Sequence, residues 1–574
     1  MEQDRRDCLQ RILESQATHK LIVSGPGTGK TYTFGKLLEY DPGESLVITL
    51  INNLVDEMQQ EIGGLAEVRT FHSLSRKLLH KHPFGGITSR FHFFPKLTQV
   101  IENDSRILNE AGYLDRGFDK DALEEAFRLL NEQDGRVDFF IERANYYDAV
   151  GFDDSVYRVF SLFRESPEHV PQYHYVMVDE YQDFNALEVG LISTLEERNR
   201  MLIVGDDDQA IYHFRQASAD HLRAKTGDPR YQHFPLPFCT RCTEVIVAAV
   251  QSIIGNAQNM GLLTQRLEKD FICYLPDKTS DNNSYPKIHV ATCSVHRKNA
   301  PYISRYVESV IASIPAGEQH LALENEYPLA LVVGESHYLK QIFDYLRDRF
   351  PNVVYRPSPN TSLTVLDGFI LLFGKQDSNL AWRILVEFLS PNEFEELLIT
   401  SIENGLPLIE LIDIEFKAQQ LSRVERIRDA IEGVDLVSDA DIADLEEVLK
   451  LPFQDIITRV SESAQLDDRA LRPMEEDIDQ AFPTILLTTY NGCKGLSAGF
   501  TFVTGFEEGV FPDTNEQPTS TEVCQFIVAL TRTRKQCHLI HTRMFAGNWT
   551  DKSIFLDWIP AELANHINVD KDFS

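Results

Sequence analysis

Short apolar runs alternate with amphipathic stretches in the N-terminal part of the chain. Apolar runs occur at residues 21–23, 46–51, 175–178 and 201–204, and residues 186–195 between the last two have helical periodicity. Strands that alternate with helices predict a parallel sheet that is covered by helices on both faces. We therefore predict a first α/β region here.

A second α/β region is predicted to begin near residue 233. Its expected helix is 523–534, and its expected strands are 288–291, 329–333, 485–489, 501–504 and 538–541. Two long stretches, about 80–170 and 364–480, instead show amphipathic helical patterns. The pattern therefore predicts two parallel-sheet regions, each interrupted by a helical insertion.

A glycine-rich segment, SGPGTGKT at residues 24–31, joins the first predicted strand to a predicted helix. Such a loop turns backbone N–H groups inward, and the helix N-terminus adds partial positive charge. Lys30 is expected to reach the β- and γ-phosphates of a nucleotide, and the Thr31 hydroxyl is expected to hold Mg²⁺. Ser24 stands where the strict pattern has glycine, and a small residue should fit. The predicted nucleotide-binding residues are Ser24, Gly25, Pro26, Gly27, Thr28, Gly29, Lys30 and Thr31.

An acidic pair follows the predicted strand at 175–178. Asp179 is expected to hold Mg²⁺ directly or through water, and Glu180 is expected to orient and deprotonate an attacking water. An acidic pair at a strand end can also be a helix cap. Its place in VDEYQDFNALE, downstream of a phosphate-binding loop, favours the catalytic interpretation.

Six segments occur in the order seen in UvrD/Rep/PcrA-type superfamily 1 helicases, which the chain resembles. They are TFHSL (70–74), VDEYQDFN (178–185), GDDDQAIYHFRQA (205–217), TYNGCKGL (489–496), GFEEGVFP (505–512) and VALTRTR (528–534). The resemblance implies an α/β fold of two RecA-like P-loop domains with ATP and Mg²⁺ at their interface. It also implies inserted domains, single-stranded DNA across the top, and 3′→5′ translocation.

The resemblance also implies roles for individual residues. Gln209 corresponds to a γ-phosphate sensor, and Arg241 and Arg532 correspond to arginines that reach the γ-phosphate from the second domain. A guanidinium suits that role because it is planar, charged and bidentate. With Glu180, these three form the predicted catalytic set. The predicted DNA contacts are Thr70, His72, Tyr212, Arg215 and Phe214, the last in place of a base-stacking Trp.

Other positions depart from the family on the side that reads the base and the sugar. Thr240 stands where a Tyr would stack on adenine, and Ser497 replaces a Glu associated with the ribose. Without these groups the site has little means of rejecting a wrong base, so we expect ATP and GTP to be hydrolysed with efficiencies within about tenfold of each other. Phe238 or Tyr32 swinging over the base is the competing possibility. The expected substrate is therefore ATP, with other nucleoside triphosphates as alternatives.

The pattern and the resemblance together define predicted domain limits. The first RecA-like domain (1A) is expected at 1–80 and 166–230, its insertion (1B) at 81–165, the second RecA-like domain (2A) at 231–363 and 481–561, its insertion (2B) at 364–480, and a tail at 562–574. The insertions are short for this family, which makes processive unwinding uncertain.

Charge and cysteine content limit the partners. The net charge is −33, and because binding of a polyanion needs a local basic surface, we expect an acidic exterior around a small basic groove. The eight cysteines form no regular framework, and Cys239 and Cys242 make a CxxC without a second pair, which disfavours a metal or redox role. No apolar run approaches a membrane span, and the N-terminus has no signal-peptide core. We therefore expect a cytoplasmic protein without membrane partners.

Two functions stay open at this level. The first is an ATP-dependent 3′→5′ DNA helicase or translocase, an NTP hydrolase that is stimulated by single-stranded DNA and acts on single-stranded or tailed duplex DNA. The second is an NTP-regulated DNA-sensing or recruitment subunit of a larger DNA-processing or anti-phage defence assembly, with a partner nuclease. The complete set of phosphate contacts favours an active NTPase under either.

Overall fold

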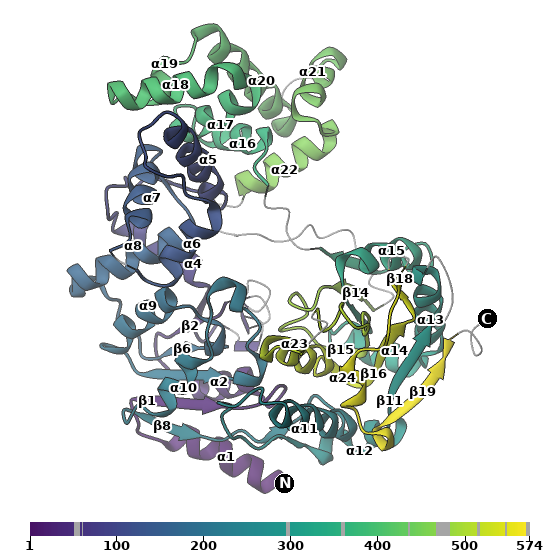
Figure 1. Cartoon of the computed structure of the whole chain (residues 1–574). Helices are drawn as coiled ribbons and strands as arrows, with labels where there is room; N and C mark the ends of the chain where they lie inside the picture. Colours follow the sequence, from purple (N-terminus) through teal and green to yellow (C-terminus); the bar gives the residue numbers. More distant parts are fainter. Residues whose placement is uncertain are drawn as a thin grey trace.

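Two parallel sheets and two helical insertions make up the molecule (Figure 1). The computed structural model describes residues 1–569 except 51–54, 56–57, 60, 63, 132, 294–298, 358–361, 434–436, 466–482, 514–516 and 546–547. This arrangement confirms the predicted fold class of two sheet regions, each interrupted by helices.

The first sheet has the strand order β3-β2-β6-β7-β1-β8, and neighbouring strands run parallel. In that order the strands are Glu67–Arg69, Leu46–Ile48, Val176–Val178, Met201–Gly205, His19–Val23 and Tyr231–Phe234. The helices around it are α1 (Glu2–Glu14), α2 (Lys30–Tyr40), α4 (Phe71–Lys81), α9 (Ala186–Glu196) and α10 (Asp220–Thr226).

Both faces of the first sheet are buried, which explains why its strands are continuously apolar. Successive strand residues point to opposite faces. Leu21 and Ile203 accordingly pack in the core that continues into the first insertion, whereas Ile22 and Leu202 pack in the core beneath α1 and α2.

The predicted limit between the two sheet regions is corrected by β8. Residues 231–234 were assigned to the second region, but Tyr231 to Phe234 pair with β1 at the edge of the first sheet. The polar residues Gln232 and His233 of this short edge strand are exposed, so its apolar pattern is weak.

The first insertion comprises α5 (Leu97–Glu110), α6 (Lys120–Arg128), α7 (Gly135–Tyr146), α8 (Phe152–Glu165), β4 (His92–Phe93) and β5 (Ala149–Val150). The second insertion comprises α16 (Val365–Gly374), α17 (Asn379–Leu389), α18 (Pro391–Asn404), α19 (Leu408–Leu411), α20 (Ile414–Glu432), α21 (Asp439–Leu449) and α22 (Phe453–Gln465). The second insertion packs against the first one, and one continuous apolar core runs through both (Figure 1).

The second sheet has the order β13-β14-β12-β15-β16-β11-β19, again with parallel neighbours. In that order the strands are Val353–Arg356, Ile485–Thr488, Ala330–Val333, Ala498–Val503, Thr533–Thr542, Ile288–Cys293 and Ala564–Asn568. The other elements of this half are α11 (Glu244–Asn259), α12 (Leu275–Ser284), α13 (Asn299–Ser313), α14 (Ala316–Glu324), α15 (Ser336–Leu346), α23 (Ser520–Leu530), α24 (Ile554–Asp557), β9 (Phe238–Cys239), β10 (Ile272–Cys273), β17 (Met544–Phe545) and β18 (Asn548–Trp549).

Two further expectations in this half are corrected. Residues 564–568 were assigned to a polar tail, but they form the edge strand β19 and pair with β11. The helix predicted at 523–534 ends at Leu530, because β16 begins at Thr533 and pairs with β15.

Candidate nucleotide site between the two sheets

The glycine-rich loop follows β1 and leads into α2, as the sequence predicts. Gly27 and Gly29 have φ angles of +67° and +88°, a backbone region that favours glycine. A Cβ atom on Gly27 would lie 2.5 Å from the Cβ of Arg241, so the loop is in close contact with a segment of the second half. The Gly27 carbonyl also accepts the Thr240 N–H at 2.9 Å.

Lys30 and Glu180 face each other inside the site. The Lys30 Nζ lies 3.4 Å from the Glu180 Oε1, and both side chains are nearly buried. Burial acts to raise the pKa of Glu180, but the positive charges of Lys30 and Lys494 outweigh it and lower that pKa. Glu180 is therefore ionised, as a base must be. Its φ of +51° is unusual for a residue with a side chain and marks a strained position after β6.

Asp179 presents an oxygen that has no protein partner. Its Oδ1 is buried and has no hydrogen-bond partner among the described residues. Burial, followed by the neighbouring charge of Glu180, raises the pKa of Asp179. A buried carboxylate without a partner is costly unless a cation binds it, and Mg²⁺ prefers oxygen ligands. Asp179 and the Thr31 hydroxyl in the first turn of α2 are therefore a donor set that fits Mg²⁺.

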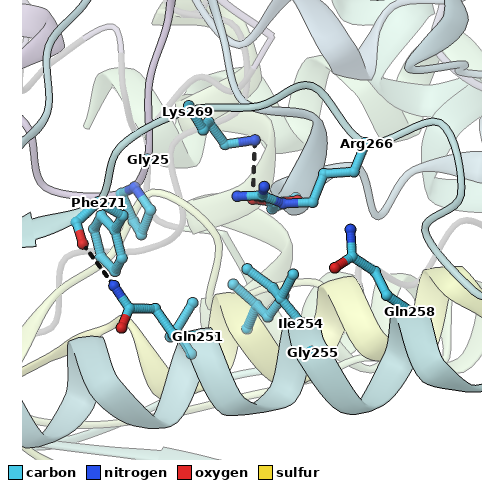
Figure 2. Close-up of a pocket in the computed structure, with 12 residues that line it drawn as sticks. Gly25, Gln251, Ile254, Gly255, Gln258, Arg266, Lys269 and Phe271 are labelled. Carbon is cyan, nitrogen blue, oxygen red and sulfur yellow. Dashed lines mark hydrogen bonds and ion pairs between the residues drawn. The ribbon is translucent and has the colours of Figure 1, made fainter.

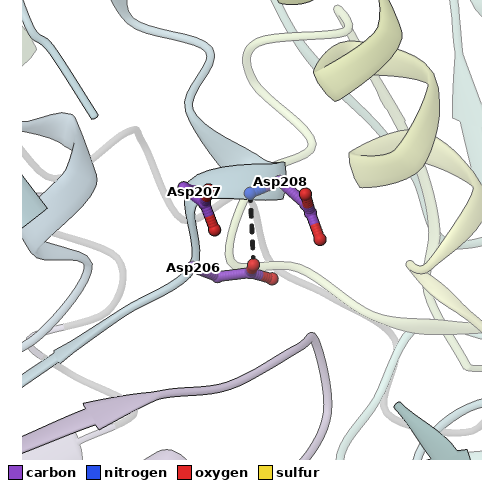
Figure 3. A group of neighbouring side chains, drawn as sticks. All are labelled: Asp206, Asp207 and Asp208. Atoms are coloured by element: carbon purple, nitrogen blue, oxygen red, sulfur yellow. Dashed lines mark hydrogen bonds between the residues drawn. The ribbon is translucent and has the colours of Figure 1, made fainter. Parts of the chain in front are cut away.

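Three consecutive carboxylates follow β7, and their geometry would suit a metal ion. Asp206, Asp207 and Asp208 offer oxygens within 4.8 Å of one another (Figure 3). However, the Lys269 Nζ lies 3.0 Å from Asp206 and 2.9 Å from Asp208, and its side chain is almost fully buried. Arg266 adds a contact of 2.8 Å to Asp208. Two cations of the second half thus pair with this cluster, and we assign no metal to it.

Gln209 and Arg532 meet across the boundary between the halves. Gln209 lies in the turn after β7, and its side-chain oxygen accepts a hydrogen bond from the Arg532 Nη2 at 2.9 Å. Burial and then the charge of Arg241 lower the pKa of Arg532 to about 10, so Arg532 stays charged near neutral pH. The two neighbouring arginines, Arg532 buried and Arg241 partly exposed, repel each other, and an anion between them would relieve that repulsion.

Two residues of this site were absent from the predicted catalytic set. Lys494 donates to Asp183 and to the carbonyl of Gln209. Gln182 donates to Glu180 at 2.7 Å and accepts the N–H of Asp206 at 2.8 Å. Both lie inside motifs quoted above, TYNGCKGL and VDEYQDFN. The motifs therefore pointed to these two residues, although the sequence analysis assigned them no role.

An open cavity of about 330 Å³ lies beside the phosphate-binding loop. Thr28, Tyr32, Phe238 and Tyr274 are among the residues that line it. The Arg5 guanidinium lies 4.8 Å from the centre of the Tyr274 ring. Tyr32 and Phe238 were considered as substitute rings from the sequence, but Arg5 and Tyr274 were not, because neither stands in a recognisable motif.

A second cavity, of about 210 Å³, lies next to Gly25 of the loop (Figure 2). Gly25 contributes to it from the first half, and Gln251, Arg266, Lys269 and Phe271 contribute from the second half. Both cations are paired with the carboxylates after β7, and Gln251 donates to the Phe271 carbonyl at 3.1 Å. The polar groups around this cavity are therefore mostly partnered within the protein.

The predicted DNA contacts divide into exposed and buried residues. Phe214 is 63% exposed, and its ring centre lies 5.8 Å from that of half-buried Tyr212. Thr70 caps α4 by accepting the Ser73 N–H. Burial, followed by the charge of Arg215, lowers the pKa of His72 to about 4, so this histidine is neutral. Phe214 is the residue that presents a free aromatic face.

Comparisons with known proteins agree with these features. The family model for the UvrD/REP helicase N-terminal domain matches residues 7–143 and 137–229. The chain is 24% identical to ATP-dependent DNA helicase PcrA of Staphylococcus aureus (strain Mu50) over 644 aligned residues, which cover 95% of this chain and 85% of that protein. It is 23% identical to ATP-dependent DNA helicase PcrA of Bacillus subtilis (strain 168), with coverage of 96% and 85%. Within the described part of the chain, no helix is long and apolar enough to span a membrane.

Proposed function

We propose that the chain is a superfamily 1 helicase of the UvrD/Rep/PcrA type, an ATP-dependent DNA motor that moves 3′→5′ along single-stranded DNA. One observation carries this proposal. Arg532 of the second half reaches Gln209 of the first half at 2.9 Å, next to the pair formed by Lys30 and Glu180. A triphosphate at this place would contact both halves, so its hydrolysis would change how they are held together.

The residues have separable roles in the proposed hydrolysis. Lys30 must leave its carboxylate partner to bind phosphate, and this exchange frees Glu180 to accept a proton from the attacking water. Gln209, held by Arg532, positions that water and senses the γ-phosphate, while Arg241 and Arg532 stabilise the charge on the transferred group. Mg²⁺ bound by Thr31 and Asp179 would supply charge neutralisation of the phosphates.

We also assign the domains on this basis. The first RecA-like domain comprises residues 1–80 and 166–234, because β8 completes its sheet. Residues 81–165 form its insertion. The second RecA-like domain comprises residues 235–363 and 481–569, because β19 completes its sheet, and residues 364–480 form its insertion.

A strand-displacement assay with the protein alone tests this function. Duplexes with a 3′ or a 5′ single-stranded tail would be incubated with ATP and Mg²⁺. We expect separation of the 3′-tailed duplex only, and the Glu180→Gln protein serves as the hydrolysis-deficient control. Separation of only the 5′-tailed duplex would contradict the proposed polarity.

A second candidate is favoured by the packing of the insertions. Asp104 of the first insertion binds Arg383 of the second at 2.9 Å, and both side chains are fully buried. Two insertions that are fixed to each other can act as a rigid platform. Such a platform would suit an NTP-regulated subunit that senses DNA and recruits a partner nuclease. Hydrolysis that depends on DNA, without displacement of either tailed duplex, would favour this candidate.

A further inference from the structure

The segment that carries Arg241 also carries two thiols in a single turn. Cys239 ends β9, and Cys242 directly precedes Thr243, the N-cap of α11. The Cys242 N–H donates to the Cys239 Sγ at 3.3 Å, and the Cys242 thiol donates to the Thr531 carbonyl at 3.6 Å. A disulfide bond has a sulfur–sulfur distance of about 2.0 Å. Closure of the pair therefore requires the Cys242 thiol to turn from the Thr531 carbonyl to Cys239, and the turn to tighten around it.

We propose that Cys239 and Cys242 form a reversible redox site, a dithiol that becomes a disulfide and thereby slows nucleotide hydrolysis. Its effect on hydrolysis rests on the proposed function, whereas the formation of the disulfide does not. This assignment reverses the expectation from sequence, where a single CxxC disfavoured a redox role. The sequence did not show that the two thiols lie against the phosphate-binding loop.

The link from the thiols to the nucleotide site is a set of direct contacts. The Thr240 N–H and hydroxyl both donate to the Gly27 carbonyl, at 2.9 and 3.2 Å. A Cβ atom built on Gly27 would lie 3.2 Å from the Cys239 Sγ, so the sulfur lies close beside the loop and a side chain there would crowd it. Tightening the turn would move Thr240 and Arg241 relative to the loop. Displacements of about 1 Å in an active site reduce rates by up to roughly 100-fold.

The two thiols are chemically distinct. Burial acts to raise the pKa of Cys239, but the neighbouring Cys242 side chain, the N–H groups of Cys242 and Arg241, and the Arg241 charge lower it overall. The neighbouring Cys239 side chain, together with burial, raises the pKa of Cys242. Cys239 is therefore the thiolate nucleophile, and Cys242 is the thiol that resolves the intermediate.

Both thiols are fully buried, so an oxidant of this site must be small, and a hydroperoxide is the class that we propose. The Cys239 thiolate attacks a peroxide oxygen, the O–O bond breaks, and the leaving hydroxide takes a proton, which gives a sulfenic acid and water. The Cys242 sulfur then attacks the sulfenic sulfur, the S–S bond forms, and a second water leaves. Overall, one hydrogen peroxide is reduced to two waters and two thiols are oxidised to one disulfide.

The test uses the full-length protein and hydrogen peroxide, with peptide mapping as a readout that is independent of activity. After brief treatment, denaturation and thiol alkylation, we expect a peptide in which Cys239 and Cys242 are joined, and dithiothreitol should restore two alkylated thiols. ATP hydrolysis should fall about tenfold or more and recover on reduction. In Cys239→Ser and in Cys242→Ser, the rate of ATP hydrolysis after peroxide treatment should equal the rate of the same variant in the reduced state.

Cys273→Ser is the matched control. Its thiol donates to the Cys242 carbonyl at 3.5 Å, so it is a neighbouring buried thiol outside the pair, and this variant should stay as sensitive to peroxide as the wild type. Absence of the 239–242 disulfide in treated wild-type protein would overturn the proposal, as would a disulfide that leaves hydrolysis unchanged. A reduced protein without hydrolysis would instead contradict the proposed function, and mapping would still decide the redox site.

Discussion

Two interfaces between distant parts of the chain are built in opposite ways. In the cleft between the sheets, the Asp179 Oδ1 has no partner among the described residues, and the buried Arg532 is next to the charge of Arg241. In the joint between the insertions, Asp104 accepts hydrogen bonds from Arg143 at 2.7 Å, Arg383 at 2.9 Å and Tyr147 at 2.6 Å. Charge in the cleft is available to a ligand, whereas charge in the joint is satisfied within the protein.

This contrast separates parts that must move from parts that must not. The charges of the cleft need an anion and a cation for balance, so the distance between its two sides is expected to change when nucleotide binds and leaves. A joint with a satisfied buried ion cluster inside a continuous apolar core resists separation. We therefore expect the first sheet and both insertions to move together against the second sheet.

The largest expected effect comes from removing charge in the cleft. Arg532→Ala should lower the turnover number of ATP hydrolysis by roughly 10³–10⁵. In enzymes that transfer phosphoryl groups, an arginine that stabilises the charge of the transferred group raises the rate by about this factor. Steady-state hydrolysis measures it. Arg534→Ala is the matched control, since Arg534 binds Ser497 at 3.1 Å, and it should stay near the wild-type rate. A drop in Arg532→Ala no larger than in the control would remove Arg532 from the catalytic set.

Breaking the joint should act on stability instead. Asp104→Ala leaves Arg143 and Arg383 buried without their shared carboxylate, which costs about 3–5 kcal/mol for groups of this kind. Denaturant unfolding, with hydrogen exchange on α17, measures the loss. Asp121→Ala, an exposed carboxylate on α6, should change the free energy of unfolding by less than about 0.5 kcal/mol. Equal stability of the two variants would show that the joint is not held by the buried cluster.

The exposed ring near the cleft should matter for DNA and not for stability. Phe214→Ala should weaken binding of a single-stranded oligonucleotide by about 1–3 kcal/mol, or roughly 5- to 150-fold in Kd, because one stacking face is lost. Fluorescence anisotropy measures this affinity. Phe388→Ala removes another exposed ring, on the second insertion, and should leave the Kd unchanged. If both variants bind like wild type, the strand does not cross Phe214.

The smallest expected effect concerns the base. Tyr32 lines the cavity beside the phosphate-binding loop and is 50% exposed. Stacking of a base on this ring is worth about 0.5–1.5 kcal/mol, and any purine offers a face to it, so Tyr32→Ala should raise KM for ATP and GTP alike by roughly two- to tenfold. Tyr40→Ala, an exposed ring at the far end of α2, is the control. Wild-type efficiencies for the two nucleotides should differ by no more than about tenfold. A preference for ATP beyond 100-fold would show that a polar group in this cavity reads adenine.

Local patterns predicted the strands and the loop between β1 and α2 well. The predicted strand at 201–204 is β7, and the predicted strand at 485–489 is β14, because buried parallel strands are short continuous apolar runs. The loop at residues 24–31 was predictable because its glycines, lysine and threonine are contiguous. Edge strands β8 and β19 were misassigned because they carry polar residues and depend on a distant partner for pairing.

The features that sequence reasoning missed are all non-local. The sequence pattern gives no sign that Asp104, Arg143 and Arg383 are buried, because charged residues in amphipathic helices are usually exposed. Asp104 and Arg383 are 279 positions apart in sequence, and only the tertiary fold brings them together. Tyr274 and Arg5 meet at the cavity from opposite sides of the cleft. The contact of Cys239 with the phosphate-binding loop is of the same kind. Pattern reasoning finds groups that are close in sequence, whereas these sites depend on tertiary packing.

The central claim is that nucleotide hydrolysis in the cleft between the sheets is coupled to DNA binding. One measurement tests this claim most directly. The rate of ATP hydrolysis would be followed while a single-stranded oligonucleotide is titrated into wild-type protein and into Glu180→Gln. We predict that the wild-type rate rises with oligonucleotide and saturates, while Glu180→Gln binds the strand but stays at a rate lower by roughly 10²–10⁴. A wild-type rate that is the same with and without saturating oligonucleotide would contradict the claim.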